Sequence, residues 1–350
     1  MQIAAEHIAP SEVRSPFLPG TNIQYAWSST TLDLLKTCPR LYEYTVIQGW
    51  ASRDESIHLR FGIEYHTALQ EYAIARAKEI NHEDAIHDTI QQLQGRVYDW
   101  VVDRSSRAGK YKNRESIVSL VVDYLDHFVD DPAETFILES GEPAVELSFR
   151  LELDWGPKAT SHVEMDGNLM EVMSGEKKAT RIFDQPYLLC GHLDRIVTYC
   201  DNLYVMDHKT SMSTLSGYYF NQWSPSNQMT LYTYAGNIVL HSPVKGVIIS
   251  AAQIKLEEPN AFQRGFTYRT PDQLSEWTDD LRFWLGQAEA FATANYWPQN
   301  DTSCGKFGGC KFREVCSKSP QVRETYLAAS FDRVDPLQTA NNPFFDRSSE

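Results

Sequence analysis

Two acidic residues and one lysine, in consecutive strand-like segments, have the types needed for phosphodiester hydrolysis. Asp207 and Lys209 close the segment 203–210, and Asp194 lies in a similar segment just upstream. Side chains in a strand alternate faces, so Asp207 and Lys209 point the same way. A hairpin at residues 200–202 would bring Asp194 beside them. Carboxylates can hold a divalent cation that activates water, while a lysine positions the water or the phosphate. Glycosidases also pair carboxylates, but the lysine favours phosphate chemistry.

Cysteines form a second group with metal-binding potential. Cys304, Cys310 and Cys316 have five residues between neighbours, in a glycine-rich segment, and Cys38 could supply a fourth thiolate. Four thiolates suit zinc or an iron–sulfur cluster. Zinc sites usually open with about two to four residues between the first cysteines, so the wider spacing favours a 4Fe–4S cluster, with zinc as the alternative. Disulfides are not expected because nothing suggests export. The other two cysteines, Cys190 and Cys200, are expected in the core.

The elements that must position these residues follow from periodicity and from helix caps. Ser28 or Ser29 can cap a helix that Pro39 interrupts, and Pro271 can open a long one. The alternation of apolar and polar residues over 144–153 is typical of a strand. We expect further helices over 62–79, 84–102, 115–129, 226–240 and 274–294, and further strands over 187–199, 203–209 and 244–252.

Composition narrows the class of protein. The 350 residues, 42% of them hydrophobic, can fill one large domain or two modest ones. No apolar run approaches the roughly 20 residues of a membrane span, and we expect no signal peptide, no membrane contact and a cytoplasmic location. The net charge of -15 argues against a generally basic nucleic-acid coat protein. No phosphate-loop motif of an ATPase occurs.

A local basic group is the candidate nucleic-acid contact. It consists of five cations around one aromatic residue, and a merely solvated loop is the alternative interpretation. Its members are Arg104, Arg107, Lys110, Tyr111, Lys112 and Arg114.

The order of these motifs resembles the PD-(D/E)xK nuclease superfamily. The closest branch is the RecB-like exonucleases, including the nuclease domain of AddB and CRISPR-associated nucleases with an iron–sulfur cluster. The resemblance covers about residues 28–316 and implies an α/β fold: a restriction-endonuclease-like core, with a central mixed sheet flanked by helices, a helical insertion and a C-terminal cysteine loop. The motifs are Cys38-Pro39, His66, Glu146, Gly191-x-x-Asp194, Asp207-x-Lys209, Gln228-x-x-x-Tyr232 and the three C-terminal cysteines.

The resemblance also assigns roles. It implies a Mg²⁺ or Mn²⁺ ion held by Asp194, Asp207 and the backbone carbonyl of His208, with Lys209 orienting water or stabilising the phosphate. His66 matches a helix histidine that ligates metal in this branch. Glu146 is a further candidate ligand, and simple solvation is its alternative. Gln228 and Tyr232, four apart and so on one helix face, would contact the active site and substrate, with ordinary helix packing as the alternative for Tyr232.

These inferences predict a nuclease domain over 26–320, with a helical insertion at about 80–135, an N-terminal arm over 1–25 and a tail over 321–350. The expected function is a metal-dependent DNA exonuclease acting on single-stranded or frayed ends in recombination, repair or phage DNA processing, with a helicase or recombination protein as a candidate partner. The alternatives are a non-catalytic DNA-end-binding or structural subunit of a helicase–nuclease complex, and a zinc-stabilised binding module.

Overall fold

The computed structural model describes residues 15–53, 56–157, 161–162, 180–181, 185–306 and 309–335. The chain divides into two compact units. The first unit comprises Met1–Arg53, Ser148–Gly191 and Ser275–Glu350, and the second comprises Asp54–Leu147 and His192–Leu274. The cysteine group belongs to the first unit, and all the predicted catalytic residues belong to the second.

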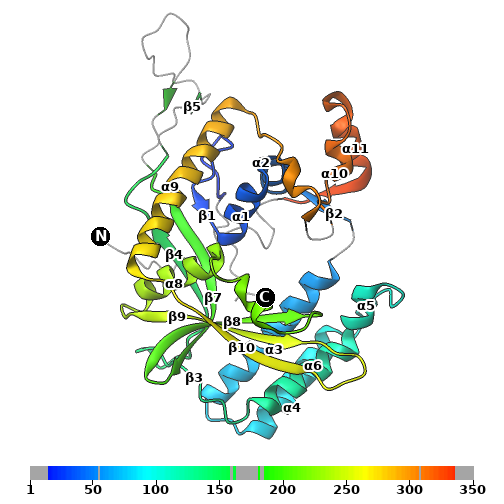
Figure 1. The fold of residues 1–350 in the computed structure, drawn as a ribbon, viewed down its shortest axis with the longest axis vertical. Helices are drawn as coiled ribbons and strands as arrows, with labels where there is room; N and C mark the ends of the chain where they lie inside the picture. The colour runs from blue at the N-terminus through cyan, green and yellow to red at the C-terminus, as the bar shows by residue number, and fades with distance from the viewer. Residues whose placement is uncertain are drawn as a thin grey trace, which may run out of the picture. The chain divides into compact units, whose positions relative to one another are not determined.

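The second unit is built on a mixed β-sheet (Figure 1). Antiparallel pairing joins β7 (Leu188–Tyr199) to β8 (Asn202–Ser211), and parallel pairing joins β8 to β9 (Val244–Gln253). Beyond β9 lies the antiparallel strand β10 (Ala261–Thr267), which was not predicted from the sequence. The short strand β3 (Glu134–Thr135) pairs with β7 on its other side. Strand β4 (Val145–Glu152) also pairs with β7.

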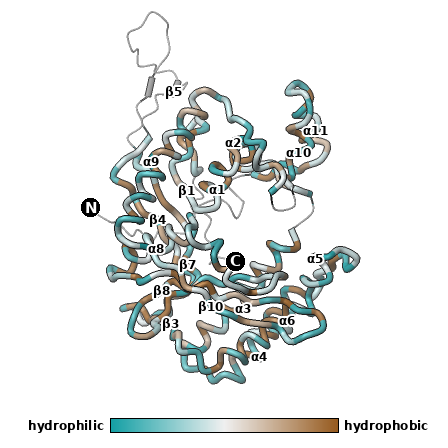
Figure 2. The backbone as a smooth tube through the Cα atoms, in the orientation of Figure 1, coloured by the Kyte–Doolittle hydropathy of each residue, from teal (hydrophilic) through white to brown (hydrophobic). Residues whose placement is uncertain are grey.

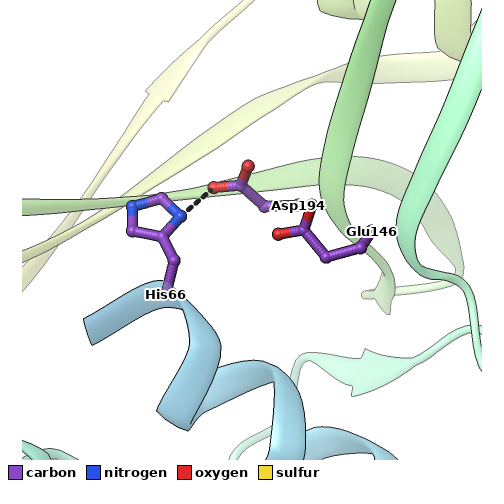
Figure 3. A group of neighbouring side chains, drawn as sticks. All are labelled: His66, Glu146 and Asp194. Carbon is purple, nitrogen blue, oxygen red and sulfur yellow. Dashed lines mark ion pairs between the residues drawn. The ribbon is translucent and has the colours of Figure 1, made fainter. Parts of the chain in front are cut away.

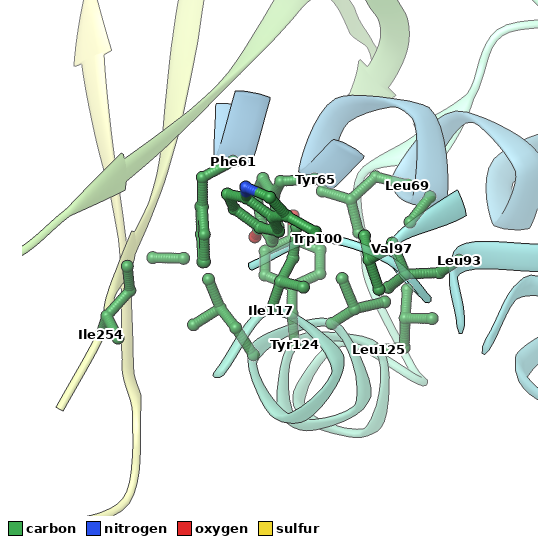
Figure 4. Close-up of a cluster of buried hydrophobic side chains, with 14 residues drawn as sticks. Phe61, Tyr65, Leu69, Leu93, Val97, Trp100, Ile117, Tyr124, Leu125 and Ile254 are labelled. Carbon is green, nitrogen blue, oxygen red and sulfur yellow. The ribbon is translucent and has the colours of Figure 1, made fainter. Parts of the chain in front are cut away.

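Three helices of the second unit pack together around one apolar core. They are α3 (Ile57–Ala77), α4 (His82–Arg96) and α6 (Arg114–His127). Figure 4 shows their inward side chains, including Phe61, Tyr65, Leu93 and Ile117, gathered with Ile254, which follows β9. The tube in Figure 2 shows α4 as largely hydrophilic, and only Ala85, Thr89 and Leu93 of this helix are buried. These helices therefore cover one face of the sheet and leave the outer side of α4 to solvent.

Helix α8 (Asn227–Val239) covers the opposite face of the sheet. Its Gly236 lies so close to Val205 and Val244 that an added Cβ would meet both at 3.3 Å or less. Val205 and His208 point to opposite faces of β8 because strand side chains alternate, and His208 contacts Tyr124 of α6. A mixed sheet with helices on both faces confirms the predicted fold class.

The first unit begins with short helices held by aromatic packing. Ser28 caps α1 (Ser29–Thr37) through a capping box with Thr31, and Pro39 opens α2 (Pro39–Tyr42). Tyr42 is fully buried between the rings of Trp27 and Trp297, at centroid distances of 5.7 and 5.0 Å. In the same unit, β1 (Ala26–Trp27) pairs parallel with the start of β7, and β2 (Trp50–Ser52) pairs with β11 (Phe331–Arg333). The unit also contains the π-helix Glu43–Ile47, α10 (Arg313–Cys316), α11 (Arg323–Ser330) and most of α9 (Pro271–Ala294), which starts in the second unit.

Several predicted boundaries shift. The helix expected over 84–102 ends at Arg96, and α3 begins at Ile57, before the expected 62. Within the second unit, two short helices were not predicted, α5 (Arg107–Tyr111) and α7 (Gly217–Asn221). None of the helices in the described ranges is long and apolar enough to cross a lipid bilayer.

Candidate metal centre and catalytic site

The hairpin between β7 and β8 brings the two predicted aspartates to neighbouring strands. Its turn residues, Cys200 and Asp201, have φ of 48° and 59°, the left-handed conformation required by a two-residue type I′ turn. Asp194 therefore lies on β7 near the Asp207–His208 peptide of β8, and the N–H of His208 donates a hydrogen bond to Oδ2 of Asp194 at 3.2 Å. The predicted hairpin is confirmed, although Cys200 is exposed in its turn, not buried.

Lys209 is held by a short chain of polar contacts. Its Nζ lies 2.8 Å from each carboxylate oxygen of Asp207, and only Oδ1 accepts a hydrogen bond of good geometry. The same ammonium donates to Oε1 of Gln228 at 3.3 Å, and Nε2 of Gln228 donates to the hydroxyl of Tyr232 at 3.0 Å. Asp207 is 1% exposed, so this is a buried ion pair and not the surface salt bridge that would be its simplest explanation.

Two carboxylates lie close to the imidazole of His66 and form a group of three candidate metal ligands with it. His66 on α3, Glu146 on β4 and Asp194 on β7 present ligand atoms that all lie within 4.8 Å of one another (Figure 3). Nδ1 of His66 is 3.1 Å from Oδ2 of Asp194. The three elements thus converge on one point from separate parts of the second unit.

The backbone of Glu146 departs from the clean strand alternation predicted for this segment. Its φ is 49°, a left-handed conformation that is uncommon for residues other than glycine and that clusters at functional sites. Phe149 and Leu151, further along β4, are buried as the alternation predicted. The irregularity at Glu146 therefore coincides with the residue that joins the His66 and Asp194 group.

Electrostatics separate the two aspartates. Burial would raise the pKa of Asp194, but the neighbouring His66 outweighs it and lowers that pKa below the usual range. Burial likewise acts to lower the pKa of His66, and Asp194 reverses the effect and raises it. For Asp207, burial raises the pKa to about 6 despite the opposing Lys209 ammonium. Two adjacent carboxylates with divergent pKa values are a frequent property of catalytic centres.

The candidate ligand set differs in one respect from the predicted one. The group of three that converges does not include Asp207, whose carboxylate is engaged by Lys209. One imidazole and two carboxylates suit a divalent cation such as Mn²⁺, whereas Mg²⁺ prefers oxygen ligands alone. The buried Oδ2 of Asp207 lies 2.8 Å from the Lys209 ammonium but accepts no hydrogen bond of good geometry.

His208 was predicted to contribute a backbone oxygen, and its side chain has a separate environment. The imidazole is 5% exposed and packs against the rings of Tyr124 and His66, at centroid distances of 5.7 and 6.0 Å. Burial, reinforced by the nearby His66, lowers its pKa well below 6.5. The ring is therefore neutral near pH 7.

The four predicted cysteines line one pocket of the first unit. Cys38 lies between α1 and α2, while Cys304, Cys310 and Cys316 come from the segment around α10. Burial raises the pKa of the Cys316 thiol, and the cations Arg40 and Arg323 act in the opposite direction. The backbone N–H of Asn300 donates to Sγ of Cys38 at 3.3 Å. Cys190, by contrast, is fully buried away from this pocket, as predicted.

The predicted basic group, for which a solvated loop was the alternative interpretation, is divided between exposed and buried positions. Part of it forms α5, and the exposed Arg104 and Arg114 both pair with Glu115. Lys112 is 5% exposed, lies over the ring of Phe61 and donates to the hydroxyl of Thr210. Tyr111 packs against the core of the second unit. Arg107 and Lys110 are the members that remain exposed without an ion pair within the described ranges.

An aromatic segment beside Lys209 was not among the predicted site residues. Trp223 presents its ring to the Lys209 ammonium, at 5.3 Å from Nζ to the ring centroid. Burial, followed by the charge of Asp207, raises the pKa of Tyr219 to about 12, so its hydroxyl stays protonated. A signal was available, since Tyr218, Tyr219, Phe220 and Trp223 form a dense aromatic run between two motifs.

Comparisons with known proteins place the chain in a family. The family model of the PD-(D/E)XK nuclease superfamily matches residues 26–317. Among solved structures, a proposed exonuclease from Eubacterium rectale aligns with a TM-score of 0.45 and 8% identity, covering 84% of this chain and 89% of that one. No curated protein matches the sequence closely enough to count as a relative. Since the family model spans most of the chain, the protein belongs to the PD-(D/E)XK nuclease superfamily.

Proposed function

We propose that this nuclease is a metal-dependent deoxyribonuclease that degrades DNA from its ends. The observation that carries the proposal is the convergence of two groups on the β7–β8 hairpin: the candidate ligands His66, Glu146 and Asp194, and the buried Asp207–Lys209 pair. A structural ion pair alone would not account for the imidazole and second acid beside it. Action on single-stranded or frayed ends rests on the resemblance to RecB-like exonucleases.

Mn²⁺ or Mg²⁺ would be held by His66, Glu146 and Asp194, with Asp207 within reach on the adjacent strand. A bound divalent cation lowers the pKa of water and neutralises charge on the phosphate. Lys209, fixed by Asp207 and Gln228, orients the attacking water or donates to a non-bridging phosphate oxygen. The hydroxyl of Tyr232 accepts a hydrogen bond from Gln228. Helix α8 therefore positions Lys209 and adds no charge to the site.

A second metal centre is proposed for the first unit: a 4Fe–4S cluster held by Cys38, Cys304, Cys310 and Cys316. Sulfurs bound to one tetrahedral zinc ion at about 2.3 Å lie roughly 3.8 Å apart. Among the described residues, no three cysteine sulfurs lie within 4.8 Å of one another. The proposal rests on the resemblance and on the four cysteines that line one pocket, and zinc is the alternative ion.

The alternative function is a non-catalytic DNA-end-binding subunit of a helicase–nuclease complex. The intact contacts of Lys209 with Asp207 and Gln228 favour the enzyme, because a binding subunit has no need to retain them. A partner helicase or recombination protein fits either function.

The test is degradation of DNA by the purified protein with Mn²⁺, Mg²⁺ or no added metal. Linear single strands and duplexes carry a label at the 5′ or 3′ end, and a closed circular single strand of the same sequence serves as the control. Release of labelled nucleotides from linear DNA with an intact circle supports an end-dependent nuclease. Cleavage of the circle would show an endonuclease instead of an end-dependent nuclease. No cleavage with either metal would favour the binding subunit.

A further inference from the structure

Trp223 contacts the proposed catalytic lysine from a segment that no motif covers. Three groups surround Nζ of Lys209: Asp207 at 2.8 Å, Gln228 at 3.3 Å and the Trp223 ring, whose centroid is 5.3 Å away. A cation within about 6 Å of a ring centroid is attracted by the ring quadrupole, and indole is the strongest of the aromatic partners.

The segment that carries Trp223 is fixed to the sheet. The carbonyl of Trp223 accepts hydrogen bonds from Oγ1 of Thr267 at 3.2 Å and from a guanidinium nitrogen of Arg269 at 3.1 Å. Phe220 lies over Gly265 of β10, where an added Cβ would come within 2.1 Å of the ring. This glycine therefore allows the close approach of α7, and the indole is held in place rather than left to move.

Two aromatic residues of the segment differ in their exposure to solvent. Tyr218, on α7, is 89% exposed, whereas Trp223 is partly buried and its Nε1 is buried with no hydrogen-bond partner in the described residues. Of the two, Trp223 is the one whose ring lies beside Lys209.

We infer that Trp223 is a positioning residue for Lys209: its ring is a third contact that fixes the ammonium, beside those with Asp207 and Gln228. The inference rests on the proposed function, in which Lys209 must meet the reacting phosphate at a defined place. Two polar contacts alone would let the flexible lysine stem rotate about them. The indole face restricts that rotation without withdrawing a proton or competing for the phosphate.

The test compares Trp223→Leu, which removes the ring face, with Trp223→Phe, which keeps a ring but has no N–H. Tyr218→Leu is the matched control, an aromatic-to-leucine change on the same segment. We expect Trp223→Leu to lower kcat about tenfold on end-labelled DNA with KM changed less than about twofold. Trp223→Phe should restore most of that loss, and Tyr218→Leu should retain full kcat.

Equal loss in the leucine and phenylalanine variants would overturn the inference, as would wild-type kcat in Trp223→Leu or an equal loss in Tyr218→Leu. A second readout does not need cleavage. If the ring and the ammonium interact, Trp223→Leu should lower Tm by about 2 °C less in a Lys209→Met background than in the wild type. A wild-type protein that cleaves no DNA would refute the proposed function, and this Tm coupling would still support or overturn the contact.

Discussion

Nδ1 of His66 lies 3.1 Å from Oδ2 of Asp194, so helix α3 delivers an imidazole to a carboxylate of strand β7. Each residue shifts the pKa of the other toward the charged form. The two residues therefore form an ion pair when no metal is bound. A bound cation must displace the proton that they share. Metal binding, proton release and the local structure of α3 are linked at this contact.

Removing a ligand should weaken metal binding. Glu146→Gln keeps the shape of the side chain but removes its charge, so we expect Mn²⁺ affinity to fall at least about tenfold in calorimetry. Glu142→Gln, an exposed acid just before the same strand, is the control and should bind like the wild type. Equal affinity in the Glu146 variant would remove this residue from the site.

Metal affinity should also depend on pH in a stated direction. The pKa of His66 is raised above 6.5, so below that raised value the imidazole is protonated and cannot ligate. Mn²⁺ affinity is therefore expected to fall as the pH drops through this pKa, with proton release on binding. Titration in buffers of different ionisation enthalpy measures that release. A His66→Gln variant should lose it, and an unchanged release would place the proton elsewhere.

Lys112 should lower stability at neutral pH. It is 5% exposed and has no carboxylate partner among the described residues, and burial lowers its pKa to about 8. The unfolded chain, with a pKa of about 10.4, binds more protons between these values, so the stability rises with pH there by at most about 3 kcal/mol. Lys112→Met should therefore raise the free energy of unfolding at about pH 7, and the gain should shrink toward about pH 10. Urea unfolding at both pH values measures this gain in the free energy of unfolding. A gain that does not change with pH would contradict its assignment to the lowered pKa of Lys112.

Loss of any proposed cluster ligand should bleach the protein. Cys38→Ala is expected to lower iron and sulfide content, visible absorbance and soluble yield, because cluster binding is part of the folding free energy. Each of the three C-terminal cysteines should behave alike. Cys200→Ala, at an exposed turn, and Cys190→Ala should keep full iron. A Cys38 variant with full iron, or zinc in place of iron in the wild type, would rule out this cluster.

Much of the site could be predicted because its residues obey local rules. Strand alternation placed Asp207 and Lys209 on one face, and the helical repeat placed Gln228 beside Tyr232, where the structure has a hydrogen bond. The hairpin followed from the short polar turn between two apolar segments. These features depend on neighbours in the chain, which a sequence records directly.

The remaining features depend on contacts between distant segments. Nothing local indicates that Lys112 leaves the basic group for a site against Phe61 and Thr210, or that β10 extends the sheet. The positive φ of Glu146 interrupts an alternation that reads as regular. In each case tertiary packing overrides the local pattern, and the local pattern does not predict that packing.

The most direct test of the account is single-turnover cleavage of end-labelled single-stranded DNA by three proteins with Mn²⁺: the wild type, Lys209→Ala and Lys255→Ala. Lys255 pairs with the exposed Glu258 on the surface of the same unit, so its loss removes an equal charge away from the site. We predict that Lys209→Ala loses at least about 100-fold in rate while remaining folded and keeping its DNA affinity, and that Lys255→Ala cleaves like the wild type. Wild-type cleavage by Lys209→Ala would contradict the assignment of the catalytic centre.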